Sequence, residues 1–146
     1  MKYICSVLVN LERETCIKLW FDEDQLHKWQ TGFQYKKWMS GKSNQEGAIS
    51  EILIIQGKFE IKLKETILEN DLPRSLTGQY DHIHMSNTQK VRFESIAEDK
   101  TEIITEVEYF AFHKFLPRML AFLFPGMYRK QSQKWLDQFK TFAEST

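Results

Sequence analysis

Residues 49–68 read ISEILIIQGKFEIKLKETIL, and this stretch predicts a β-hairpin. Two runs rich in β-forming residues flank the turn Gln56-Gly57-Lys58. In the second run, apolar side chains at every other position alternate with charged or polar ones, so one face of that strand is apolar and the other meets solvent. Glu65 is the exception, because it stands in the apolar series between Leu63 and Ile67.

The chain on both sides of this hairpin predicts further strands and two short helices. A period of two is typical of a strand, and apolar residues three or four positions apart are typical of a helix. In the strand that begins at Phe33, we expect Phe33, Tyr35 and Met39 on one face and Lys36 on the other. The expected strands are residues 3–9, 33–39, 75–84, 88–97 and 101–112, and the helices lie at 12–21 and around Leu26 and Trp29.

The last part of the chain predicts one long amphipathic helix. Apolar residues recur at steps of three and four from Leu116 to Phe142. Pro117 suits the first turn of this helix, and Pro125 is expected to kink it without ending it. The sequence therefore predicts an α+β fold in which a curved antiparallel sheet of about seven strands, two short helices and a long C-terminal helix enclose a cavity.

Composition limits the classes of function. A length of 146 residues fits one domain, residues 1–146. Lys plus Arg equals Asp plus Glu at 20 each, which argues against binding to nucleic acid. Cys5 and Cys16 lack CxxC spacing and are expected to be reduced core residues, which favours a cytoplasmic protein. The lipophilic stretch 115–127 is too short to span a membrane, and the sequence has no glycine loop for a nucleotide, so we expect no cofactor.

Short motifs in this order resemble a known superfamily. They are Val7-Leu8-Val9-Asn10, Leu26 with Trp29, Glu46-Gly47-Ala48, Pro73-Arg74-Ser75-Leu76, Phe93 before Thr101, and Leu136 with Lys140 and Glu144. With the element order, they make nearly the whole chain similar to the START-like (SRPBCC) superfamily, which includes polyketide cyclase/dehydrase-like proteins and Bet v 1-like lipid binders. This resemblance implies the helix-grip fold and a cavity for a small hydrophobic or amphipathic molecule. It implies no particular reaction, because the superfamily shares no catalytic motif.

Polar residues on the inward faces of the strands are the candidate ligand contacts. We expect Glu65, Tyr80 and His82 to point into the cavity and to bind the polar end of a mostly apolar ligand. The alternative is that Glu65 lies at the sheet margin and that His82 and His84 are rim residues. The full set of expected ligand-binding residues is Glu65, Tyr80, His82, Gln89, Phe93, Thr105, Tyr109, Leu120, Phe124 and Met127.

Other interpretations remain open from the sequence. His82 and Glu65 could act as an acid/base pair in a small cyclase or dehydratase. A metal site at His82 and His84 has no evident third ligand. Alternatively, the aromatic residues could fill the interior and leave little cavity. A protein-interaction module could instead use an exposed apolar cluster to bind a partner protein or to form a homodimer; this cluster is Phe110, Phe112, Phe115, Leu116 and Phe124.

Overall fold

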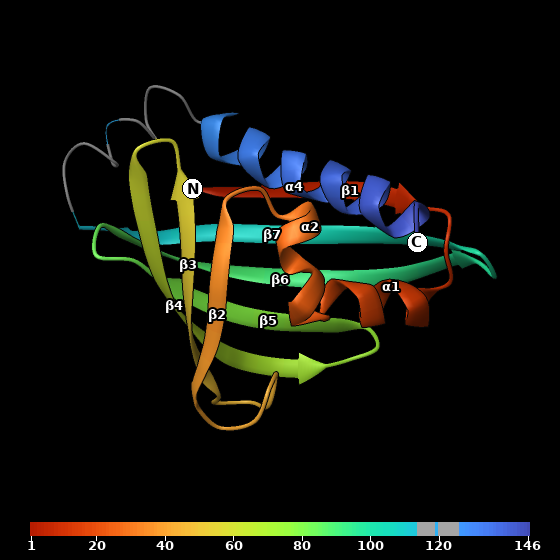
Figure 1. Cartoon of the computed structure of the whole chain (residues 1–146), viewed down its shortest axis with the longest axis horizontal. Helices are drawn as coiled ribbons and strands as arrows, with labels where there is room; N and C mark the ends of the chain where they lie inside the picture. Colours follow the sequence, from red (N-terminus) through yellow and green to blue (C-terminus); the bar gives the residue numbers. More distant parts are fainter. Residues whose placement is uncertain (114–118, 120–125) are drawn as a thin grey trace.

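The computed structural model describes residues 1–113, 119 and 126–146. Its strands and helices follow the predicted order closely (Figure 1). The strands are β1 (Lys2–Val9), β2 (Phe33–Ser40), β3 (Ile49–Gln56), β4 (Phe59–Asp71), β5 (Ser75–Asp81), β6 (Met85–Ala97) and β7 (Lys100–Phe112). The helices are α1 (Arg13–Trp20), the 3-10 helix η1 (Glu23–Gln25), α2 (Leu26–Trp29) and α4 (Gly126–Glu144).

The strands form one antiparallel sheet of seven strands in the order β1-β7-β6-β5-β4-β3-β2. Figure 1 shows the sheet curving around α4, with α1 and α2 on the same inner side. Antiparallel neighbours from β2 to β7 are joined by hairpins, and β1 pairs with β7. The predicted curved sheet and long C-terminal helix are confirmed.

The hairpin predicted over residues 49–68 is the β3–β4 pair. Ser50 lies opposite Glu65, and Glu65 lies opposite Tyr80 of β5. In β4, Glu65 and Ile67 are buried while Lys62 and Lys64 are exposed, which confirms the predicted alternation of faces. The register therefore brings three polar residues of β3, β4 and β5 side by side on the inner face.

α4 packs its apolar stripe on the sheet. Leu136, Phe139 and Ala143 are buried, as the spacing of three and four residues predicts. The hydroxyls of Tyr3 and Ser132 lie 2.8 Å apart and join β1 to the helix. The predicted helix start at Pro117 and the kink at Pro125 lie outside the described residues. Within the described ranges, every helix is too short or too polar to cross a bilayer.

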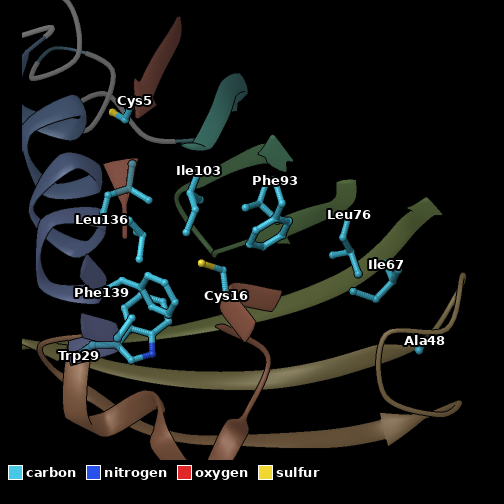
Figure 2. Close-up of a cluster of buried hydrophobic side chains, with 13 residues drawn as sticks. Cys5, Cys16, Trp29, Ala48, Ile67, Leu76, Phe93, Ile103, Leu136 and Phe139 are labelled. Carbon is cyan, nitrogen blue, oxygen red and sulfur yellow. The ribbon is translucent and has the colours of Figure 1, made fainter. Parts of the chain in front are cut away.

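The hydrophobic core lies between α4 and the strands, where Figure 2 shows Trp29 beside Phe139 and Leu136 near Ile103. The ring centroids of Trp20 and Trp29 are 4.8 Å apart, and that of Phe139 is 5.0 Å from each of them. Fully burying an apolar side chain of this kind stabilises a fold by about 1.5–3 kcal/mol. Cys5 and Cys16 are buried free thiols, as predicted.

Two predicted strand limits are wrong, and the difference moves two histidines. β5 ends at Asp81 and β6 begins at Met85, so His82 and His84 lie in a tight turn. The backbone N–H of His82 donates to the oxygen of Met85 at 2.9 Å, which closes the hairpin there. The sequence run 75–84 looked like one strand because the turn lacks glycine, asparagine and proline.

Candidate ligand-binding cavity

A cavity of about 160 Å³ lies between the inner face of the sheet and the helices. Its walls are mostly apolar and rich in rings. The apolar lining from the helical side is Trp20, Phe21, Leu26, Trp29, Trp135 and Leu136, and that from the strands is Phe33, Ile52, Ile54, Leu63, Leu76 and Val91. The interior aromatic residues therefore line a space and do not fill it completely.

Glu65 is the centre of a polar cluster in this cavity. It is only 4% exposed, and an unpaired carboxylate would be strongly disfavoured there. Nζ of Lys36 lies 2.8 Å from Oε1, and the Ser50 hydroxyl donates to the same oxygen at 3.0 Å. The Tyr80 hydroxyl donates to Oε2 at 2.6 Å. Three donors from three strands thus stabilise the carboxylate.

Lys36 faces the cavity, contrary to the expectation that it is solvated. The pairing of β2 with β3 shifts register between Phe33 and Tyr35, and this irregularity turns Lys36 to the inner side. Its ammonium also lies 4.6 Å from the centroid of the Trp38 ring, whose N–H donates to Glu23 at 2.8 Å. Met39, expected on the inner face, is exposed. Sequence periodicity could not show this shift.

The surroundings of Tyr80 keep its phenol protonated and leave space for its ring beside Glu65. Its burial, the charge of Glu65 and the hydrogen bond to Glu65 raise the pKa of the phenol well above its ordinary value of 10.0. The phenol therefore stays protonated and keeps donating. A Cβ at Gly78 would lie 3.2 Å from the Tyr80 hydroxyl oxygen, so the absence of a side chain at Gly78 gives the ring its space.

Two residues of the cavity lining each carry a buried polar atom that has no hydrogen-bond partner among the described residues. These atoms are Oγ1 of Thr105 on β7 and Nε1 of Trp29 on α2. Thr105 is 7% exposed and Trp29 is 4% exposed. Most buried polar atoms in proteins are paired, so these two call for an explanation. The sequence suggested Thr105 as a ligand contact, but nothing in it marked Trp29 as more than a core residue.

Four of the residues expected to bind a ligand line the cavity: Glu65, Tyr80, Gln89 and Thr105. Phe93 is instead part of the hydrophobic core. The Tyr109 ring stacks with those of Tyr3 and Phe112, and its burial raises the pKa of its phenol. Met127 is on the exposed first turn of α4. Leu120 and Phe124 lie outside the described residues.

His82 lies apart from this cluster. Its Nδ1 accepts a hydrogen bond from the backbone N–H of His84 at 3.2 Å, and the two rings are 5.0 Å apart. Burial lowers the pKa of His82, with a further contribution from His84. No hydrogen bond joins His82 to Glu65 within the part of the chain that is described, so the geometry does not assemble the acid/base pair.

The apolar cluster considered as a protein-interaction surface is described only in part. Phe110 is exposed, and the Phe112 ring stacks on Tyr109 at 5.7 Å. Phe115, Leu116 and Phe124 lie outside the described residues. The interaction surface and the homodimer stay predictions.

Comparison with solved structures gives many matches over the whole chain. The Zhui aromatase/cyclase of a Streptomyces species has a TM-score of 0.80 at 8% identity, covering 99% of this chain and 93% of that one. A START superfamily protein from Mycobacterium smegmatis has a TM-score of 0.77 at 11% identity over 99% and 97% of the two chains. Norcoclaurine synthase from Thalictrum flavum has a TM-score of 0.73 at 12% identity over 100% and 94%. This chain has the START-like helix-grip fold.

The helix-grip fold is thus shown by structure and not by sequence. No protein-family model matches the chain, and no curated protein matches it either. At 8 to 12% identity, these helix-grip structures share an architecture with the chain but need not share residues of the site. The resemblance stated from short motifs is confirmed for the fold.

A second hollow lies on the outside of the helix grip, between α2 and α4. It has a volume of about 770 Å³ and is bordered by basic side chains that include Lys28, Arg129, Lys130 and Lys134. The cavity beside Glu65 is the better candidate site, because it combines mostly apolar walls with the buried polar cluster of Glu65.

Proposed function

We propose that this protein binds or carries one small, mostly apolar molecule in the cavity between the sheet and α4. The observation that carries this proposal is the pair of unpartnered polar atoms, Oγ1 of Thr105 and Nε1 of Trp29, in an otherwise largely apolar lining. Leaving such atoms unpaired costs about 1–3 kcal/mol each. A bound molecule that pairs with them recovers that free energy and also fills the space.

The polar cluster orients the ligand in this proposal. Both oxygens of Glu65 already accept hydrogen bonds, so Glu65 acts through its neighbours. It holds the Lys36 ammonium and the Tyr80 phenol at the cavity wall, where both can meet the polar end of a ligand. Glu65 is then a positioning residue, and Tyr80 and Lys36 are the ligand contacts that this cluster contributes.

The comparisons support ligand binding, because the Zhui aromatase/cyclase, norcoclaurine synthase and the START superfamily protein share the fold. Catalysis is not part of the proposal. The cyclase or dehydratase alternative required His82 to work with Glu65, and the hydrogen bonds of the two residues run to different partners.

Native mass spectrometry of freshly purified protein tests the proposal. We expect a co-purifying molecule that is lost on denaturation. Val91→Phe places a larger side chain in the cavity lining and should remove this species, although overpacking costs about 1–3 kcal/mol of stability. Ile4→Phe is the control, because Ile4 lies exposed on β1. An unliganded wild type that also gains no stability from hydrophobic small molecules would refute the proposal.

A further inference from the structure

Both buried, unpartnered polar atoms of the cavity residues can donate a hydrogen bond. Nε1 of Trp29 can only donate, and the Thr105 hydroxyl is free to donate. An ammonium has three N–H bonds, and Nζ of Lys36 has Oε1 of Glu65 as its single hydrogen-bonding partner among the described residues. These donors come from α2, β7 and β2, on different walls of one cavity. A complementary ligand must therefore offer an acceptor.

The charges in the lining argue against an anionic ligand. The formally charged side chains are Glu23, Lys36 and Glu65, so carboxylates outnumber the ammonium. A ligand carboxylate would add a further negative charge next to Glu65. It would also compete for Lys36 and leave the buried Glu65 carboxylate with two neutral donors only. The acceptor of the ligand is therefore an uncharged oxygen.

The size and shape of the walls limit the apolar part of the ligand. The cavity volume is about 160 Å³. An apolar cavity of about 150 Å³ in another protein holds one benzene ring, so this space suits one ring with a small substituent. The rings of Trp20 and Trp29 lie 4.8 Å apart in the wall and give an aromatic ligand faces and edges to pack on.

We propose that the ligand is an uncharged, single-ring molecule with a carbonyl or similar oxygen that accepts a hydrogen bond from Thr105. This inference rests on the proposed function, because it specifies the chemistry of the molecule in the same cavity. Thr105 carries the assignment for two reasons. Thr105 is a lining residue whose hydroxyl is buried and unpartnered, and it lies on the inner face of β7, whose position is fixed by β1 and β6 on either side.

Isothermal titration calorimetry with three probes tests the inference. Acetophenone is neutral and carries a carbonyl, ethylbenzene has nearly the same shape without an acceptor, and benzoate is an anion. We expect the wild type to bind acetophenone about tenfold more tightly than ethylbenzene, as one satisfied buried hydrogen bond would give, and to bind benzoate most weakly. Thr105→Val should reduce the preference for acetophenone to less than about threefold.

Thr77→Val is the matched control, because Thr77 is on β5 next to the inward-facing Leu76 and points to the other side of the sheet. It should leave the preference unchanged. Equal binding of acetophenone and ethylbenzene by the wild type, or tightest binding of benzoate, would overturn the inference but not the proposed function. A preference that persists in Thr105→Val would overturn the role of Thr105. If none of the three probes bound but native mass spectra showed a co-purified molecule, only the proposed ligand class would be refuted.

Discussion

The Lys36 ammonium lies 2.8 Å from Oε1 of Glu65, and the side chains of the two residues are 11% and 5% exposed. Buried ion pairs of this kind gain little net free energy, because desolvation offsets most of the attraction. They are nevertheless costly to break, since the remaining charge stays buried without its partner. The pair therefore constrains the positions of β2 and β4 around the cavity. Removing one partner should cost more free energy of unfolding than removing both would suggest.

Single and double substitutions of this pair should not be additive. Lys36→Met and Glu65→Gln are each expected to lower the free energy of unfolding by about 3–5 kcal/mol, because each leaves one buried charge. The double variant should lose clearly less than the sum. Urea unfolding curves measure all three values. Lys62→Met, on the exposed face of β4, is the control and should stay within about 0.5 kcal/mol of the wild type. Simple additivity would mean that the charges do not interact.

Two threonines on β7 should respond in opposite directions to the same substitution. Thr105→Val removes a buried hydroxyl that has no partner among the described residues, and we expect it to raise the free energy of unfolding of the ligand-free protein by about 1 kcal/mol. Thr101→Val removes a hydroxyl that donates to the Leu11 oxygen at 2.8 Å, and it should lower that free energy by about 1–2 kcal/mol. Denaturant unfolding after removal of any bound molecule gives both values. A loss on Thr105→Val would show that its hydroxyl is satisfied.

The turn at His82 should make the fold sensitive to mild acid. Burial and His84 lower the pKa of His82 from its ordinary value of 6.5, so the unfolded chain binds more protons between the lowered pKa and 6.5. The stability is therefore complete above about pH 6.5 and decreases as the pH falls through the folded pKa. Melting temperatures measured between about pH 7.5 and pH 5.5 should show this decrease.

His82→Asn should flatten that pH dependence, because its amide oxygen can still accept from the His84 N–H without gaining charge. His27→Gln is the control, since His27 is exposed on α2 and its loss should leave the profile of the wild type. An unchanged slope in His82→Asn would assign the acid sensitivity to other groups.

The C-terminal end of α4 should fray locally when Glu144 is neutralised. Its carboxylate accepts from Lys140 at 2.7 Å and from the Asn10 backbone N–H at 3.2 Å, and these hydrogen bonds lower the pKa of Glu144 below 4.5. Glu144→Gln should accelerate hydrogen exchange of the Asn10 amide severalfold, with less than about 1 kcal/mol lost globally. The wild type should lose the same protection as the pH falls through the folded pKa of Glu144. Glu14→Gln, exposed on α1, should leave the Asn10 amide unaffected.

Much of the fold could be predicted because patterning and topology agree. The alternation in β4 and the buried series Leu136, Phe139 and Ala143 each have the period of their element. Glu65 was also identifiable, since a carboxylate in an apolar series needs partners. Its partner Lys36 was not identifiable, because a register shift in β2 reverses the face on which that residue lies.

The rest of the site depends on information that one sequence does not contain. Thr101 and Thr105 are the same residue type on the same face, yet only Thr101 finds an acceptor, which a distant loop supplies at Leu11. His82 shared a predicted face with Tyr80 until the chain turned after Asp81. Hydrogen-bond partners at long sequence separation and the limits of turns are set by tertiary packing, so they became visible only in the structure.

The pairing of β1 with β7 has a consequence for how the chain folds during translation. Within this domain β1 is made before the other strands, but its strand partner β7 is the last strand of the sheet and α4, which packs over β1, follows it. The backbone groups of β1 stay without their native partners until β7 has been made. Closure of the sheet at this seam is therefore a late event in the folding of this domain, and until then β1 is an unpaired strand that can pair with other chains.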